Sequence, residues 1–450
     1  MPVIDDKTIK ELDAIRGKRN LLIWENRAYV KGNNPETLNE APHKKPDNRI
    51  TIPFAKMAVE TLCGYAGRAG DITINWENIT TIEEEATSKK AAKLDPYIEL
   101  QKEIAEHNEM ELETSQLYEV GITQGESYEL FWVSEELKLS SMMTPEYKKI
   151  PNVEIVLLWS SDIKRKLEAA LRFWVSGKNH FLDVYRPLFS ERWNKLDGKN
   201  TWIRDEEFDT KYPYTEVPLA IYSINSDTVS IFQAEKDIIT GNDKLLNKSV
   251  NEVDRFNAMI ALFPQLVGKE MADKLVEMKI IDDLEQFEKW PQYLQKDLNG
   301  VKEFYTMVSE RLEKFFHKSI KIPDFSDENF VNAQSGLAMA FKLIGLEFLA
   351  AKIDMYFYKG LRQRNKLIND VISMNSKFNT DDYKMEIISK RNLPMDKPAI
   401  IDMVVKLNGI LSKETLLKFL PEDIVKDVEA ELLRLEGDQE EVDLELNIED

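Results

Sequence analysis

Residues that could carry chemistry are present, but they do not form a known catalytic or metal-binding pattern. The chain has four histidines, none with a second histidine or cysteine at the spacing of a metal site: His43, His107, His180 and His317. We therefore expect surface or core roles for them and predict no metal site. Carboxylates are so numerous that pairs such as Asp282-Asp283 and Asp327-Glu328 arise by chance, and we interpret them as parts of solvated faces.

Glycine-rich and thiol motifs also favour structural interpretations. The chain has no G-x-x-x-x-G-K-[ST] motif, so the phosphate cradle of a P-loop ATPase is missing. The tetrapeptide Ser176-Gly177-Lys178-Asn179 lies between two expected strands, which predicts a hairpin turn. Gly64, Gly67 and Gly70 do not form G-x-G-x-x-G and predict a helix end and a turn. Cys63 fits a buried apolar role. We expect no catalysis and no cofactor.

A basic cluster lies in the last third of a strongly helical segment and consists of Lys359, Arg362, Arg364 and Lys366. Two interpretations stay open: the cluster meets DNA phosphates, or it pairs with acidic groups at a subunit interface. The net charge of −20 argues against a tight, static grip on DNA, which needs basic patches that displace counterions. A surface past which DNA slides remains compatible with this charge.

The overall composition predicts a folded protein of more than one module. The 450 residues are 43% hydrophobic and 10% aromatic, enough for a sizeable core. A single cysteine excludes an internal disulfide and fits a reducing compartment. The start of the chain lacks the apolar core of a signal peptide, and no uncharged apolar run approaches the ~20 residues of a membrane span. We expect a soluble intracellular protein.

Hydrophobic periodicity predicts an α+β fold that is mostly helical. We expect a short helix and an exposed arm within 1–46, and further helices at 51–66, 97–119, 228–263, 300–320, 337–372, 397–408 and 412–435. An antiparallel meander is expected between about 120 and 225, with strands 127–133, 153–159, 170–176, 180–186 and 201–204, and strand-like segments lie at 71–76 and 384–388. Helices longer than one compact core indicate self-association. The acidic tail 436–450 predicts disorder.

Three stretches, in order along the chain, carry a family resemblance. Residues 322–347 read IPDFSDENFVNAQSGLAMAFKLIGLE, in which Pro-Asp, Asn-Phe and Ser-Gly-x-Ala lead into a helix. Residues 48–65 read NRITIPFAKMAVETLCGY, and residues 402–435 contain LNGILSKET. Together they resemble the portal proteins of tailed bacteriophages, of the siphophage type found in phages of Gram-positive hosts.

The resemblance implies an elongated subunit with long stem helices and an antiparallel β region in the wing, assembling into a ring of about a dozen copies. The implied layout is wing 1–227, stem helix 228–263, clip 264–299, second stem helix 300–322, tunnel loop 323–336, long wing helix and return 337–394, and crown helices 395–435. The tunnel loop would face DNA with Asp324, Ser326, Asp327, Glu328, Asn329, Asn332 and Gln334.

The implied function is a non-enzymatic conduit at one capsid vertex, through which the terminase motor packages double-stranded DNA and DNA later exits. The implied partners are other copies of the chain, the terminase large subunit, capsid and scaffolding proteins, the head-tail connector or adaptor, and the DNA, without a membrane. The protein would lie at the portal vertex of the virion, and in the host cytoplasm during assembly. Two alternatives come from other classes: a nuclease or phosphotransferase that binds divalent metal ions, and a non-viral helical scaffold.

Overall fold

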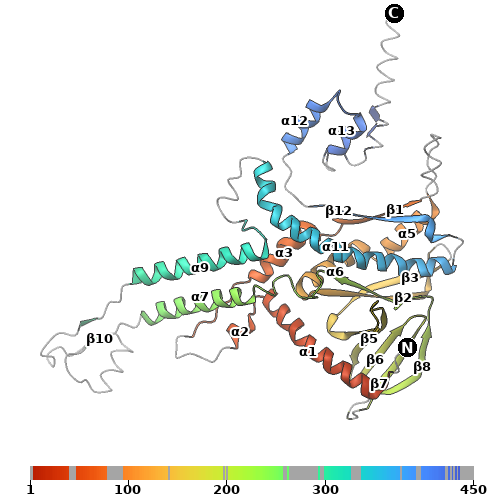
Figure 1. Cartoon of the computed structure of the whole chain (residues 1–450), viewed down its shortest axis with the longest axis horizontal. Helices are drawn as coiled ribbons and strands as arrows, with labels where there is room; N and C mark the ends of the chain where they lie inside the picture. Colours follow the sequence, from red (N-terminus) through yellow and green to blue (C-terminus); the bar gives the residue numbers. More distant parts are fainter. Residues whose placement is uncertain are drawn as a thin grey trace, which may run out of the picture. The chain divides into compact units, whose positions relative to one another are not determined.

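The computed structural model describes residues 4–39, 47–78, 95–139, 142–195, 198, 201–256, 261–262, 292–293, 298–325, 336–375, 378–391 and 397–420, with a few positions between 424 and 435 (Figure 1). The chain divides into unit 1, Met1–Val331 with Phe341–Arg391, and unit 2, Asn332–Ala340 with Asn392–Asp450. Helices and antiparallel sheets together confirm the α+β class. Within the described ranges, no helix is both long and apolar enough to cross a membrane.

The amino-terminal part of unit 1 is helical. Its helices are α1 Asp6–Val30, α2 Pro35–Leu38, α3 Phe54–Ala66, α5 Pro96–His107 and α6 Met110–Gln124. The short helix predicted within 1–46 is thus a long one, and Asp5 caps it by accepting a hydrogen bond from the Thr8 backbone N–H at 2.8 Å. The helix predicted at 51–66 is confirmed; it contains Gly64 and ends before Gly67.

The prediction of one helix over 97–119 is wrong, because the chain breaks between α5 and α6. The Asn108 side chain donates hydrogen bonds to the carbonyl oxygens of Ile104 at 2.9 Å and of Pro145 at 3.0 Å. Glu109 then adopts a left-handed conformation with φ of 50°. An asparagine that binds its own backbone competes with the helix, and it lets α6 start in a new direction.

Two antiparallel sheets follow these helices. The first has the order β3-β2-β9, from β2 Glu126–Leu139, β3 Met142–Ile150 and β9 Leu219–Ser223. The second has the order β4-β5-β6-β7-β8, from β4 Ile155–Trp159 after a 3-10 turn at Asn152–Glu154, β5 Leu167–Ser176, β6 Asn179–Arg186, β7 Phe189–Lys195 and β8 Ile203–Lys211. The second sheet confirms the predicted meander in part, with Gly177 at φ 61° in the predicted turn. The predicted strand 127–133 belongs to the first sheet, and β7 was not among the predicted strands. The first sheet was not foreseen as a separate layer.

α1 packs against the five-stranded sheet and forms a core with it. The buried apolar side chains of this core are Ile4, Ile9, Val156, Ala169, Leu171, Phe173, Leu182, Val184 and Trp202. The Arg16 guanidinium of α1 stacks over the Phe173 ring at 4.5 Å and donates to the Val153 carbonyl oxygen at 3.0 Å. The arginine stem thereby extends the apolar contact while its charged end stays hydrogen-bonded.

The two strand-like segments outside the meander pair with each other. β1 Ile72–Asn78 and β12 Tyr383–Ser389, which follows a 3-10 turn at Thr380–Asp382, form an antiparallel pair with Ile74 opposite Ile387. Both predicted strands are confirmed, but their pairing joins segments far apart in the sequence, which local alternation cannot reveal.

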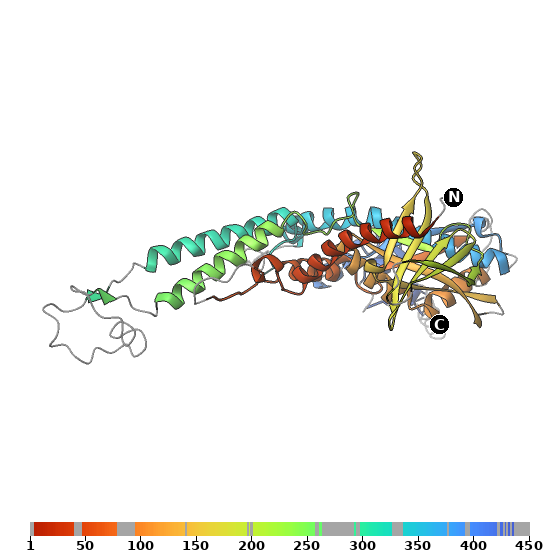
Figure 2. The same ribbon diagram turned by 90° about the horizontal axis from the view of Figure 1, so that it is seen from below.

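Two long helices of unit 1, α7 Lys236–Phe256 and α9 Leu298–Ile320, run side by side in opposite directions (Figure 2). α9 confirms the helix predicted at 300–320. α7 starts later than the predicted 228–263, because Thr228 has φ of 52° and the Ile231 N–H donates to the Ile122 carbonyl oxygen at 3.1 Å. Apart from 292–293 and 298–299, the predicted clip 264–299 lies outside the described residues, and the short strands Ala261–Leu262 (β10) and Gln292–Tyr293 (β11) pair at its edge.

α11 Gly336–Asn375 has 40 residues and confirms the helix predicted at 337–372. One face is buried through Leu346, Ala350, Ile353, Phe357, Leu361 and Ile368. Polar contacts from several elements hold it: Trp76 of β1 donates to Asn365 at 2.9 Å, and Arg391 after β12 donates to Glu347 at 2.9 Å and to Asp354 at 2.7 Å. α11 is therefore the helix around which the α and β parts of unit 1 join.

Unit 2 contains α12 Lys397–Leu407, which confirms the helix predicted at 397–408, and α13 Lys413–Phe419. The helix predicted over 412–435 is too long for α13. Ser412 caps its start by accepting from the Thr415 N–H at 3.3 Å. Leu420 is extended with ψ of 143°, which fits the residue that precedes Pro421. The tail 436–450 lies outside the described residues.

Candidate functional site

Residues 47–52 lie along α7 and are held by one row of its side chains. The Asn247 side-chain amide binds both backbone polar groups of Ile50. It accepts a hydrogen bond from the Ile50 N–H at 2.6 Å and donates one to the Ile50 carbonyl oxygen at 3.0 Å. One turn earlier, Asp243 accepts from the Ile52 N–H at 2.8 Å, and one turn later Asn251 accepts from the Asn48 N–H at 2.7 Å. The i, i+4 spacing gives α7 a polar edge that binds an extended segment.

Burial raises the pKa of Asp243, and the hydrogen bonds from Ile52 and Asn34 partly offset that effect. The motif residues 48–52, one of the three stretches that carry the resemblance, therefore fasten the amino-terminal arm to α7. The sequence predicted the helix that this motif leads into, but not the contact of its first residues with α7.

The chain reverses sharply after α9, where the predicted tunnel loop begins. Lys321 has φ of 63°, and the buried Ile322 accepts a hydrogen bond from His317 Nδ1 at 2.9 Å. Of the predicted DNA-facing residues, only Asp324 lies in the described part of the chain, half-buried beside α9. The others lie outside the described residues: Ser326, Asp327, Glu328, Asn329, Asn332 and Gln334.

α11 crosses this turn closely. A Cβ atom added at Gly345 would lie 3.3 Å from the Lys321 carbonyl oxygen. The glycine in the FKLIGLE motif therefore permits the end of α9 and the first half of α11 to approach each other. This contact fixes where the segment 321–325 leaves the α7–α9 pair.

The face of α11 that turns away from the core carries a stripe of exposed apolar side chains. These are Phe341, Ile344, Phe348 and Met355, of which Phe341 is 65% and Phe348 is 62% exposed. Their spacing of three, four and seven residues places them on one side of the helix. We call them the α11 stripe. Contiguous exposed aromatic and aliphatic side chains mark interaction surfaces in soluble proteins.

The structure does not keep the basic cluster together. Lys359 and Arg362 are exposed, and Lys366 pairs with Glu216 at the surface. Arg364 is only 1% exposed and points into unit 1, so it is not available to DNA or to another subunit. The expectation that Arg364 meets DNA or another subunit is therefore wrong. The charge pattern of the sequence does not show that one of the four basic residues has an acceptor inside the fold.

Arg364 is bound by side chains from two other elements, a strand and a helix. Its Nε and Nη2 atoms donate to the two carboxylate oxygens of Glu129 at 2.9 and 2.8 Å, and Nη1 donates to the Thr114 hydroxyl at 2.7 Å. The Tyr222 hydroxyl also donates to Glu129, at 2.6 Å. Burial alone would lower the pKa of Arg364, but the Glu129 carboxylate reverses this effect and the pKa is raised. The pair is a structural ion pair with bidentate geometry.

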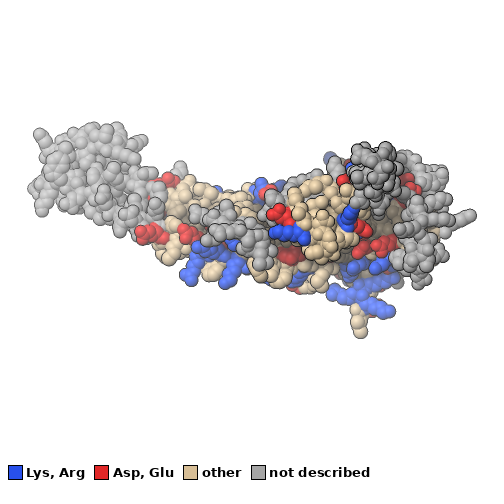
Figure 3. Space-filling model, turned by 90° about the horizontal axis from the view of Figure 1, so that it is seen from above, with Lys and Arg blue, Asp and Glu red and all other residues tan. Residues whose placement is uncertain are grey.

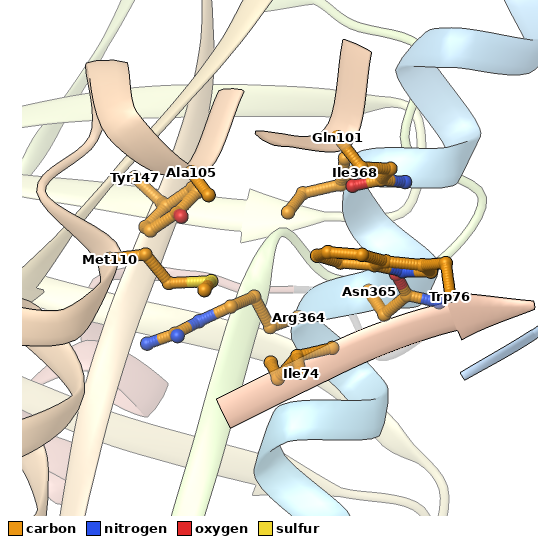
Figure 4. A pocket seen from close by; sticks show the side chains of 9 residues that line it. All are labelled: Ile74, Trp76, Gln101, Ala105, Met110, Tyr147, Arg364, Asn365 and Ile368. Atoms are coloured by element: carbon orange, nitrogen blue, oxygen red, sulfur yellow. The ribbon is translucent and has the colours of Figure 1, made fainter. Parts of the chain in front are cut away.

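A small cavity beside Arg364 is too small to bind a ligand. Figure 4 shows the guanidinium extending toward Met110 and Tyr147, away from Trp76 and Asn365. The cavity has a volume of about 10 Å³, which is at most the space of one water molecule. It therefore offers no room for a nucleotide or a substrate.

On the face that Figure 3 shows, Lys and Arg side chains form separate groups between acidic ones and no continuous basic surface. On this face the distribution agrees with the net charge of −20. It does not resemble the basic stripe of a protein that holds DNA tightly.

Comparisons with known proteins show to which family the chain belongs. Residues 9–443 match the family described as phage portal protein, SPP1 Gp6-like. The chain belongs to this portal family. It is also 22% identical over 419 residues to the portal protein of Clostridium phage phiCD119, covering 88% of this chain and 86% of the relative. The family resemblance inferred from the three stretches is thereby confirmed, and phage portal function follows from family membership.

Proposed function

We propose that this portal-family chain assembles into a closed ring through which double-stranded DNA is packaged and later released. The observation that carries the proposal is the α11 stripe, an apolar surface that unit 1 leaves uncovered. α1 also carries exposed apolar side chains, on more than one side of the helix, at Ile15, Leu21, Leu22 and Trp24. Exposed apolar side chains on two different helices of one subunit fit a head-to-tail interface, and such an interface makes a ring when its rotation closes.

In this proposal α7 and α9 form the stem, residues 264–299 the clip, residues 323–336 the tunnel loop and the helices after 395 the crown. The wing comprises 1–227 together with 337–394. The acidic and polar loop residues would touch the phosphates weakly, because every strong contact to a moving duplex must be broken again. Since the sequence has no P-loop motif, a separate terminase would supply the energy.

The exposed Lys359, Arg362 and Lys366 remain candidates for charge-assisted contacts with a neighbouring subunit. Capsid and scaffolding proteins and a head-tail connector complete the proposed partners, and the capsid vertex is the proposed location. We infer a structural and not a catalytic role.

Electron microscopy of the purified full-length protein tests this proposal. We expect ring-shaped particles with a central hole wide enough for a DNA duplex. The variant Phe341→Ser/Phe348→Ser should reduce the ring population strongly while its circular dichroism stays unchanged. Met374→Ser is the matched control, because Met374 is also exposed on α11 but lies outside the stripe. Rings that persist in the double variant would exclude the α11 stripe as the interface, and particles without a hole would reject the conduit.

A further inference from the structure

Three side chains with metal-binding atoms meet where the chain leaves α9. Glu313, His317 and Asp324 each offer one ligand atom, and these atoms all lie within 4.8 Å of one another. Ligand atoms around one tetrahedral zinc ion, each about 2.0–2.2 Å from the metal, lie about 3.3–3.6 Å apart. Side-chain rotations that shorten the three separations to this value would bring all three atoms to bonding distance of one ion.

The backbone holds this group together. Glu313 and His317 lie one turn apart on the same face of α9. The left-handed residue Lys321 folds the chain back, and the buried Ile322 anchors the segment so that Asp324 returns to α9. The neighbouring Phe316 ring packs edge-on against the His317 ring, with a centroid distance of 5.5 Å, and on Phe54 of α3, with a centroid distance of 5.0 Å. The arrangement is set by packing and by a turn, not by the three side chains alone.

The hydrogen bond of His317 prepares its ring for a metal. Nδ1 lies 2.9 Å from the Ile322 carbonyl oxygen. A carbonyl oxygen only accepts, so the proton of the neutral ring sits on Nδ1 and leaves a lone pair on Nε2. Nε2 is shielded from solvent and has no hydrogen-bond partner among the described residues. Metal-binding histidines are typically fixed in this way, by donating their other N–H to a carbonyl or carboxylate.

We propose that Glu313, His317 and Asp324 bind one divalent transition-metal ion, of the Zn²⁺ or Mn²⁺ class. The two carboxylates balance the charge of the ion. The imidazole favours Zn²⁺ over Ca²⁺ and Mg²⁺, which prefer oxygen ligands alone, and the two carboxylates also suit Mn²⁺. Three protein ligands leave further coordination positions for water.

A bound ion would tie the segment 322–324 to α9. That segment immediately precedes residues 326–335, so the ion would fix the base of the proposed tunnel loop. The metal site itself rests on the geometry of unit 1 and does not depend on the proposed function.

Metal titration of the full-length protein, stripped with EDTA and dialysed, tests the site. Isothermal calorimetry with ZnCl₂ and with MnCl₂, and elemental analysis after gel filtration, should give one bound ion per subunit. His317→Ala and Asp324→Asn should each weaken binding by at least about tenfold, as loss of even an outer partner does. Glu310→Gln is the matched control, since Glu310 is an exposed carboxylate on the same helix, and it should bind like the wild type.

Two outcomes would overturn the proposal. One is a wild-type protein that retains and binds neither ion. The other is binding that His317→Ala and Asp324→Asn leave unchanged, which would place the ions on the acidic surface. If His317→Ala fails to fold by circular dichroism, the nearly isosteric Asp324→Asn decides between the outcomes.

Discussion

Arg364 of α11 and Glu129 of β2, 235 positions apart in the sequence, form a bidentate ion pair that is sealed from solvent, with N–O distances of 2.8 and 2.9 Å. The pair joins the longest described helix to the three-stranded sheet. Thr114 and Tyr222 supply the remaining hydrogen bonds, so α6, β2, β9 and α11 meet at one point.

Breaking this pair should destabilise the protein strongly. Arg364→Met leaves the Glu129 carboxylate buried without a counter-charge, which typically costs about 3–5 kcal/mol. We expect the urea midpoint of unit 1 to fall accordingly. Lys366→Met is the matched control, because its pair with Glu216 is at the surface and should contribute about 1 kcal/mol or less. Equal midpoints for the two variants would contradict this assignment.

Sequence reasoning found this arginine but not its role, and the reason is physical. Residues at helical spacing reveal a helix because its period is local, so α9 and α11 were predicted. The partner of Arg364 comes from a distant strand, and a charge in the sequence does not show what lies opposite it in the fold.

The other differences between the predictions and the structure also arise from contacts between residues far apart in the sequence. The pairings of β1 with β12 and of β2 with β9 are set by tertiary packing, and the break at Asn108 depends on the Pro145 carbonyl oxygen. At the candidate metal site, the i, i+4 spacing of Glu313 and His317 was visible in the sequence. The return of Asp324 was not, because it depends on the left-handed turn at Lys321.

The only cysteine of the chain should react slowly in the native state. Burial, with the nearby Glu119 and Glu60, raises the pKa of Cys63 from 9.0 to about 12. The thiolate fraction at pH 8 is then about a thousandfold lower than in the unfolded chain, and the thiolate is the reactive form. We expect iodoacetamide to modify native Cys63 at least about 100-fold more slowly than the urea-unfolded protein.

The raised pKa of Cys63 also gives a pH dependence of stability. The folded state binds the thiol proton more tightly than the unfolded state. The stabilisation is therefore complete below pH 9.0 and is lost as the pH rises toward about 12. Cys63→Ala should reduce the slope of the unfolding free energy against pH between these values. The raised pKa of Cys63 would be contradicted if the wild type and Cys63→Ala had equal slopes of unfolding free energy against pH. Equal alkylation rates in the native and unfolded protein would also contradict it.

The polar side chains Asp243, Asn247 and Asn251 of α7 should slow amide hydrogen exchange in residues 47–52. Asn247→Ala removes two hydrogen bonds to the Ile50 backbone, each contributing about 1 kcal/mol. We expect faster hydrogen exchange at the Ile50 amide and a loss of about 1–3 kcal/mol of stability. Lys248→Ala is the control, since the exposed neighbour should change neither quantity. An unchanged Ile50 exchange rate in Asn247→Ala would show that the row does not hold the segment.

α11 approaches β9 closely at Gly360, so a larger residue at this position should destabilise the fold. A Cβ atom at Gly360 would lie 2.4 Å from Tyr222 Cδ1 and 2.8 Å from the Ile221 carbonyl oxygen, and the backbone carbonyl cannot move aside cheaply. We therefore expect Gly360→Ala to lower the unfolding free energy by about 1–3 kcal/mol, the usual cost of overpacking. Gly64→Ala is the matched helix control: its added Cβ meets nothing within 4 Å, so it should be neutral or stabilising by up to about 1 kcal/mol. Thermal unfolding of both variants measures the difference, and a Gly360→Ala protein as stable as Gly64→Ala would mean that α11 and β9 are further apart than the structure places them.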